Sequence, residues 1–244
     1  MLLKLYTVAQ LAALAFGQTT LIPSDSFSSF DSHWNYLYPW GSDHNGGARM
    51  DKSQVFTAQG YLTLTSKPVT GQPPAHHGGK DIPINYLSGA IHAKKTFTVQ
   101  TGGGFDFSAD FIAPVDKGTW PAFWLTAVKG WPPEIDVAEW KGSGKISFNT
   151  FNTSSQVTAR DVPYPNPKAW HTVRAEIRDA NGRDVSVKFY LDNTLVTTQR
   201  GSNYVNAGLY FIINYQMEGS SGSPGPSTTT TYSVRNVKVV SYNP

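Results

Sequence analysis

The chain has 244 residues and a nearly balanced charge, with 20 Lys and Arg against 17 Asp and Glu and a net charge of +3. Charged residues make up only 15% of the chain, and the basic ones are scattered, which argues against a nucleic-acid-binding surface. The absence of cysteine excludes a disulfide framework.

The N-terminus has the features of a secretory signal. Lys4 precedes an apolar run that ends in Ala15-Phe16-Gly17, where small residues suit cleavage. This run is too short to span a membrane, and no later segment reaches that length. We therefore expect residues 1–17 to be removed and the protein to be secreted to the extracellular space, with no membrane partner.

The remainder predicts an all-β protein. Short alternating or β-branched runs recur between turn signals, and no extended helical period competes with them. Eight segments are expected to be strands, at residues 61–65, 90–99, 105–111, 146–151, 171–177, 185–191, 209–214 and 234–240. Asp192 and Asn193 are typical turn residues after one of them. No domain boundary or repeat interrupts the pattern, so residues 18–244 are predicted to form one domain of two packed antiparallel sheets.

Three segments have the composition of loops, at 67–83, 164–167 and 218–231. The first contains His76 and His77, but two adjacent histidines lack the spacing of a metal-ligand set. We predict solvated loop histidines and no metal site.

The earlier segment 43–50 is rich in glycine, which allows close backbone approach. Its residues Asn45 and Arg49 offer hydrogen-bond donors. The segment either supplies polar contacts to a ligand or simply forms a turn, and the sequence leaves both readings open.

The most informative stretch is the acidic motif of residues 134–139. Glu134 and Asp136 are two apart and therefore share one face of a strand, whereas Glu139 has the opposite parity. One extra residue bulging out around Val137-Ala138 would restore the register and bring all three acids to one surface. We predict that bulge.

Paired carboxylates can cleave a glycosidic bond: a separation of about 5–5.5 Å gives retention through a covalent intermediate, and about 6.5–9.5 Å gives inversion. Glu134 is predicted to be the nucleophile. Glu139, next to Trp140, is predicted to be the acid, because an apolar neighbour would raise its pKa. The alternatives are a solvated strand face or a structural calcium site.

Three of the seven tryptophans, Trp120, Trp124 and Trp131, lead into this motif. The apolar face of a sugar ring packs on aromatic rings, so carboxylates flanked by them suggest carbohydrate chemistry. At least one of the three is expected to be a core residue instead. Further along, Asn152-Thr153-Ser154 forms an N-glycosylation sequon, which makes Asn152 a candidate glycosylation site.

The order of these motifs resembles glycoside hydrolase family 16, which contains laminarinases, lichenases, agarases, carrageenases and galactanases. In that family the motif carries the nucleophile, an assisting aspartate and the acid/base in the order of Glu134, Asp136 and Glu139. The resemblance covers most of residues 18–244 and implies a β-jelly-roll sandwich with an open cleft on its concave face.

The resemblance also implies that Trp120, Trp124 and Trp131 lie beside the cleaved sugar. Two features depart from the laminarinase pattern: only Pro132-Pro133 precedes the first glutamate, and the next strand carries asparagines where a histidine is common. Fungal endo-β-1,3-galactanases of this family are similar in size and in departing from that pattern.

We therefore expect a secreted, endo-acting, retaining glycoside hydrolase whose partner is a polysaccharide, with β-1,3-galactan as the preferred substrate. The alternatives are an endo-β-1,3(4)-glucanase, a transglycosylase, a non-catalytic glycan-binding jelly roll and a polysaccharide lyase. We expect a monomer that requires no cofactor, and the sequence leaves a structural calcium ion open.

Overall fold

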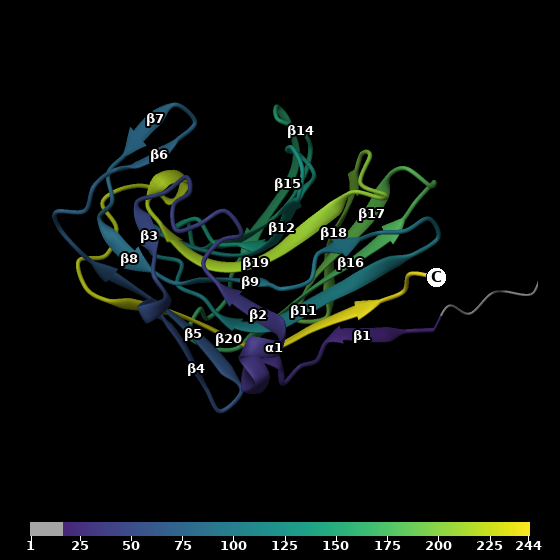
Figure 1. Cartoon of the computed structure of the whole chain (residues 1–244), viewed down its shortest axis with the longest axis horizontal. Coiled ribbons are helices and arrows are strands. Elements are labelled where there is room, and N and C mark those ends of the chain that lie inside the picture. Colours follow the sequence, from purple (N-terminus) through teal and green to yellow (C-terminus); the bar gives the residue numbers. More distant parts are fainter. Residues whose placement is uncertain (1–16) are drawn as a thin grey trace, which may run out of the picture.

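Two large β-sheets packed face to face form the molecule, as expected from the strand pattern (Figure 1). They are seen in a computed structural model that describes residues 17–244, so the predicted signal segment lies almost entirely outside the described residues. Sheet A has ten strands, in the order β18 (Thr194–Gly201), β17 (Val185–Leu191), β16 (His171–Asp179), β11 (Gly104–Ile112), β20 (Thr230–Ser241), β5 (Tyr61–Pro68), β8 (Tyr86–Ser88) and β3 (Ala48–Met50), with β1 (Thr19–Ile22) beside β20 and β4 (Val55–Ala58) beside β5.

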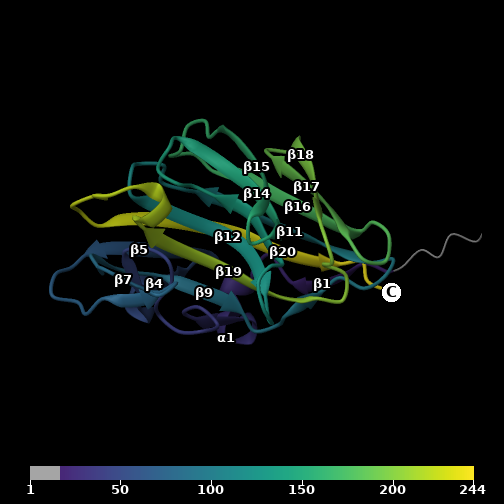
Figure 2. The same cartoon turned by 90° about the horizontal axis from the view of Figure 1, so that it is seen from above.

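Sheet B carries the cleft described below. It has eight strands, in the order β15 (Gln156–Pro163), β14 (Lys145–Thr153), β13 (Glu134–Glu139), β12 (Thr119–Ala127), β19 (Gly208–Met217), β9 (Ala90–Ala93) and β2 (Trp34–Tyr36), with β10 (Phe97–Thr98) beside β19. Figure 2 shows β15, β14, β12, β19 and β9 following one another across this sheet.

Pairing within both sheets is antiparallel, as predicted, except that β3 and β8 run parallel. The helices of the described chain are short: η1 (Ser26–Ser29), α1 (Phe30–His33), η2 (Lys52–Gln54) and η3 (Gly219–Ser221). Within residues 17–244 no helix is long and apolar enough to cross a membrane.

The eight predicted strand segments all fall on observed strands, and 185–191 matches β17 residue for residue. The segment 90–99 is wrong as a single strand, because the chain bends at Lys94 and Lys95 and separates β9 from β10. The turn at Asp192-Asn193 is confirmed, since both residues have positive φ and join β17 to β18.

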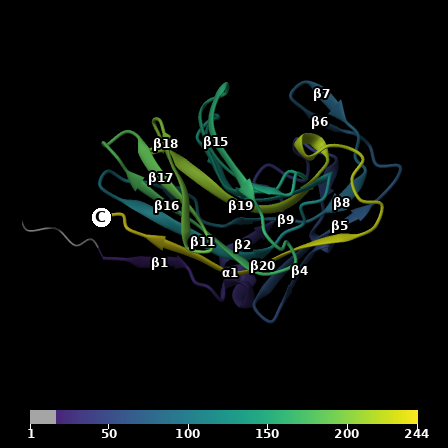
Figure 3. The same ribbon diagram turned by 180° about the vertical axis from the view of Figure 1, so that it is seen from behind.

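The loop prediction for 67–83 is also wrong in part. This segment contains a two-stranded hairpin, β6 (Ala75–His77) and β7 (Lys80–Ile82). Gly78 and Gly79 form its turn with φ of 57° and 77°, values that glycine adopts without steric cost. Figures 1 and 3 show this hairpin and the β14–β15 hairpin rising on either side of β19.

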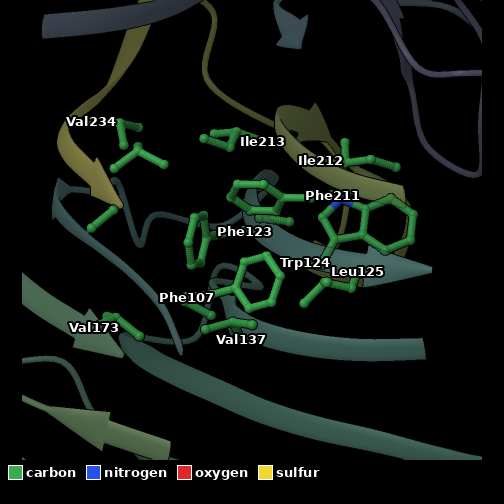
Figure 4. Packing of buried hydrophobic residues seen from close by; sticks show 14 of the residues in the cluster. Phe107, Phe123, Trp124, Leu125, Val137, Val173, Phe211, Ile212, Ile213 and Val234 are labelled. Carbon is green, nitrogen blue, oxygen red and sulfur yellow. The ribbon is translucent and has the colours of Figure 1, made fainter. Parts of the chain in front are cut away.

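The core lies between the sheets and is rich in phenylalanine. Phe107 of sheet A meets Phe211 of sheet B at 5.1 Å between ring centroids, and Phe211 meets Phe123 at 4.9 Å (Figure 4). Both contacts are edge-on, the arrangement that aromatic quadrupoles favour. Side chains alternate along β12, so Phe123 points into this core while Trp124 points to the outer face of sheet B.

Candidate active site

Strand β13 contains the predicted bulge. Along β12, Trp124 pairs with Asp136 and Phe123 pairs with Ala138, which leaves Val137 without a partner. The pairing with β14 shows the same shift between Asp136 and Glu139. The extra residue changes the parity of the strand, and Glu139 therefore returns to the face that carries the other two acids.

The three acids line one cavity on the outer face of sheet B. Glu134, Asp136 and Glu139 border a space of about 320 Å³, which we call the acid cavity. Asp136 and Glu139 are buried, at 6% and 8% exposure, while Glu134 is partly exposed to the cleft. Polar groups this deeply placed need hydrogen-bond partners.

Glu139 has three such partners. Its carboxylate accepts hydrogen bonds from Trp120 Nε1, from Lys141 Nζ at 2.7 Å and from Asn149 Nδ2 at 3.1 Å. Asn149 Nδ2 also donates to Asp136 Oδ2 at 2.8 Å, so one amide links two of the acids.

The predicted influence of Trp140 on Glu139 is wrong. Because neighbouring residues point to opposite faces, Trp140 is fully buried in the core, where its ring lies 5.4 Å from those of Phe111 and Tyr164. The neighbour of Glu139 is instead the cation Lys141. Burial by itself would lower the pKa of Lys141, but the contact with Glu139 raises it overall, so the lysine stays charged.

Glu134 is held from both its backbone and its side chain. Tyr204 Oη accepts from the Glu134 amide at 2.9 Å and donates to its carbonyl at 2.8 Å. The carboxylate accepts from Trp131 Nε1 at 2.9 Å and from Thr126 Oγ1 at 3.2 Å. These contacts fix the direction in which the carboxylate faces the cavity.

Burial and mutual repulsion favour protonation within the cluster. Burial raises the pKa of Glu134 to about 7, against the hydrogen bond from Trp131 and with the charge of Glu139 adding to the rise. Burial, together with the charges of Glu139 and Glu134, raises the pKa of Asp136 well above its usual range. Glu134 and Asp136 therefore hold a proton more strongly than free carboxyl groups do.

The three predicted tryptophans all border the cleft, including those that are largely buried. Trp120 and Trp124 are 7% and 6% exposed, and Trp131 is 45% exposed. Trp120 bonds to Glu139 and Trp131 to Glu134, while Trp124 Nε1 donates to Asn214 Oδ1 at 2.7 Å. Trp124 also belongs to the apolar core cluster, so it serves both the core and the cleft.

Only one of the two contact residues predicted in the loop at 43–50 lies in the cleft. Asn45 lines the cleft, but Arg49 does not line either of the cavities described here. Arg49 instead donates to the carboxylate of Asp43 from Nε at 2.8 Å and from Nη2 at 2.9 Å. The structure thus makes Arg49 the partner of Asp43 and not a group directed at a sugar.

This loop lies against β19 through close backbone contacts. A Cβ on Gly46 would come within 2.6 Å of Gln216 and of the Met217 carbonyl, so only glycine fits. Gly47 N donates to that carbonyl at 2.7 Å, and Ala48 N donates to Gln216 Oε1 at 2.9 Å. The loop is therefore positioned by the sheet that carries the acids.

A second cavity of about 1000 Å³ joins the acid cavity on the Glu134 side. Both are lined by Trp124, Trp131 and Glu134, together with His44 and Asn45 of the loop. We call the second space the aromatic cavity, because six of its lining residues carry rings: Trp40, His44, His76, His77, Trp124 and Trp131.

Several polar residues of the cleft were missed as functional residues by the sequence analysis. They are Lys141, Asn149, Asn214 and Gln216, with His44 at the border of the two cavities. Strand parity was the signal that could have found Asn214 and Gln216, two residues apart on one strand. His76 and His77 are exposed as predicted, but on a hairpin, where His76 Nδ1 lies 3.0 Å from Asp81.

Two further predictions concern groups beside the cleft. Asn152 lies on β14, where its Oδ1 accepts from Ser202 N at 3.0 Å; its glycosylation remains a prediction. Across residues 17–244, no three His, Cys, Asp or Glu side chains group in a way that could hold a metal ion.

Solved structures share this fold over nearly the whole chain. An endo-1,3-β-glucanase from Streptomyces sioyaensis superposes with a TM-score of 0.71 at 20% identity, covering 97% of this chain and 100% of that one. SCLam, a non-specific endo-β-1,3(4)-glucanase from family GH16, gives a TM-score of 0.69 at 16% identity, with coverage of 94% and 93%. At these identities the likeness concerns the fold, and it confirms the expected jelly-roll sandwich.

Sequence similarity gives the family. No protein-family model matches the chain. Over 222 residues, however, the sequence is 50% identical to galactan endo-β-1,3-galactanase of Flammulina velutipes, covering 90% of this chain and 89% of that protein. The chain therefore belongs to the same protein family as the Flammulina velutipes galactan endo-β-1,3-galactanase.

Proposed function

We propose that this protein is an endo-acting, retaining glycosidase of glycoside hydrolase family 16 that cleaves internal β-1,3 linkages of galactan. The observation that carries the proposal is the convergence of Glu134, Asp136 and Glu139 on one cavity through the bulge at Val137. The activity named for the relative at 50% identity supports galactan as the substrate. The family assignment is supported by the likeness to SCLam.

The chemistry divides between the two glutamates. Glu134 attacks the anomeric carbon and forms a glycosyl ester, while Glu139 gives its proton to the leaving glycosidic oxygen. Glu139 then removes a proton from water, which attacks the ester and releases Glu134. Asp136, linked to Glu139 through Asn149, adjusts the protonation of the pair.

The surrounding contacts suit these roles. Trp131 and Thr126 hold the Glu134 carboxylate toward the cavity, so it does not need to reorient before attack. Lys141 and Asn149 both donate to Glu139 Oε2, so they keep this carboxyl group in place beside the cavity during both steps.

The biological setting is part of the proposal. We infer that residues 1–17 are removed on secretion and that residues 18–244 act as one extracellular catalytic domain and as a monomer. Asn152 is proposed as a glycosylation site on β14, with its side chain directed away from the acid cavity.

Incubation of the purified protein with debranched β-1,3-galactan, laminarin, lichenan and agarose tests the substrate. We expect internal cleavage of galactan above the others, and ¹H NMR of the first products should show the β-anomer. Cleavage of laminarin alone would favour a glucanase, and extension of a labelled acceptor would reveal transglycosylation. Binding without new reducing ends would contradict hydrolysis, and unsaturated products would indicate a lyase.

A further inference from the structure

His44 occupies an unusual position at the border of the two cavities. It lines both the acid cavity and the aromatic cavity. Its ring stacks on Trp124 at 5.9 Å with an angle of 20° between the planes, and it meets His77 edge-on at 5.0 Å. Trp40 lies 5.2 Å away on another side. Tyr38 lies 5.4 Å away, so four aromatic groups surround this imidazole.

The rings that hold His44 are themselves anchored. Trp124 is fixed by its hydrogen bond to Asn214, and the loop that carries His44 is tied to β19 at Gly47 and Ala48. A side chain held from several directions loses little freedom when it binds a ligand, so its hydrogen bonds contribute more to affinity.

The imidazole is neutral and open to a ligand. Burial, with a smaller contribution from the charge of His77, lowers the pKa of His44 to about 4. In the described part of the chain no residue forms a hydrogen bond with either ring nitrogen. A neutral imidazole offers one donor and one acceptor in its plane, which matches hydroxyl groups of a sugar.

We propose that His44 is a specificity-determining residue that hydrogen-bonds the hydroxyl groups of the sugar lying in the aromatic cavity. This inference rests on the proposed function, because that sugar belongs to the glycan whose neighbouring unit is attacked by Glu134. The aromatic cavity lies on the Glu134 side, whereas Glu139 and Lys141 line only the acid cavity. His44 thus contacts the part of the glycan that becomes covalently bound to Glu134.

The tryptophan rings and the imidazole recognise different features of the sugar. Trp40, Trp124 and Trp131 offer flat apolar surfaces, which accept the C–H face of any hexopyranose. One hexose differs from another in the orientation of its hydroxyl groups, and only a polar group in a fixed position can distinguish these orientations by hydrogen bonding. His44 supplies that group within the aromatic wall.

The test is His44→Phe, which keeps an aromatic ring and removes both nitrogens. With β-1,3-linked galacto-oligosaccharides of three to six units, we expect KM to rise about tenfold, as the loss of two ordinary hydrogen bonds predicts, with kcat changed by less than about threefold. His44→Gln retains a donor and an acceptor and should recover part of the loss. His33→Phe, at α1 and outside both cavities, is the matched control.

A second measurement observes the ring directly. In a Glu134→Gln background, the ring nitrogen resonances of His44 should shift when galactotetraose is added, and those of His33 should not. Melting temperatures of the variants show whether the fold is kept. If the wild type cleaves laminarin and not galactan, the proposed substrate is wrong, and the same series is run on laminari-oligosaccharides.

The role of His44 is overturned if His44→Phe keeps the wild-type KM on whichever glycan the wild type cleaves. It is equally overturned if the ring resonances of His44 stay in place when the oligosaccharide is bound.

Discussion

The two cavities of the cleft share one wall but differ in chemistry. The acid cavity gathers three carboxylates and the lysine that pairs with one of them, whereas the aromatic cavity contains only Glu134 of these groups and is lined by three tryptophans and three histidines. Trp131 and Glu134 stand at the border and line both. The arrangement separates bond cleavage on sheet B from sugar recognition, to which the loop of Trp40 and His44 and the β6–β7 hairpin also contribute. Variants in the two cavities should therefore change different kinetic constants.

Glu134→Gln should have the largest effect. An amide cannot form the glycosyl ester, so kcat is expected to fall by roughly 10⁴-fold or more while galactan still binds. Reducing-end assays and calorimetric titration of the same preparation measure the two quantities. Asp31→Asn, an exposed acid on α1 that lines neither cavity, should behave as wild type. Turnover that survives in Glu134→Gln would remove this residue from the role of nucleophile.

Asn149→Ala tests the amide that links two acids. Loss of its hydrogen bonds to Asp136 and Glu139 should lower kcat by roughly 10- to 100-fold, since bonds to charged groups are stronger than neutral ones. Asn152→Ala, on the same strand and directed to the other face, is the control when both are made in a host without N-glycosylation. Equal rates for the two variants would contradict a catalytic contribution from Asn149.

Trp131→Ala removes a side chain that lines both cavities. It removes an aromatic surface and the hydrogen bond to Glu134, so kcat/KM should fall by about tenfold. The comparison variant is Trp170→Ala, which removes a tryptophan that lies under Arg235 and lines neither cavity. A result in which both variants lose the same activity would point to a general effect on the fold.

Lys141→Met should have the smallest effect and a definite sign. The charge of Lys141 lowers the pKa of Glu134, so its removal raises that pKa above the present value of about 7. The acidic limb of the pH profile of kcat/KM, which requires ionised Glu134, should move to higher pH by roughly half a unit. Lys145→Met, an exposed change on β14, is the control. A limb that stays in place or moves to lower pH would contradict the electrostatic role.

Strand parity accounts for what the sequence could predict at the site. The spacing of Glu134, Asp136 and Glu139 allows a common face only with one extra residue, and the structure contains it at Val137. Local patterns of this kind depend on neighbouring residues alone, and for the same reason they located the eight strand segments and the turn at Asp192-Asn193.

Such local patterns could not predict contacts between segments that are distant in the sequence. Arg49 was expected to offer free donors, but they bond to the carboxylate of Asp43. Trp140 was expected to lie beside the Glu139 carboxyl group, but the alternation of side chains places it in the core. The position of His44 depends on Trp124 and on a hairpin thirty residues further along the chain. The Gly78-Gly79 turn is the one local signal that could have revealed that hairpin.

The unpaired Val137 makes the geometry of β13 all-or-none. If Val137 instead took a regular place in the ladder, Glu139 and Trp140 would exchange faces, which would bury a carboxylate and expose a large ring. Deletion of Val137 would only remove the bulge and would leave Glu139 on the face of Glu134 and Asp136. No intermediate register exists between the bulged and the regular pairing, so a second inserted residue that joined the ladder would separate the acids, whereas loss of the extra residue would keep them together. The acidic motif can therefore lose its extra residue in evolution and keep its chemistry, because the number of residues in the ladder, and not the length of β13, decides where Glu139 points.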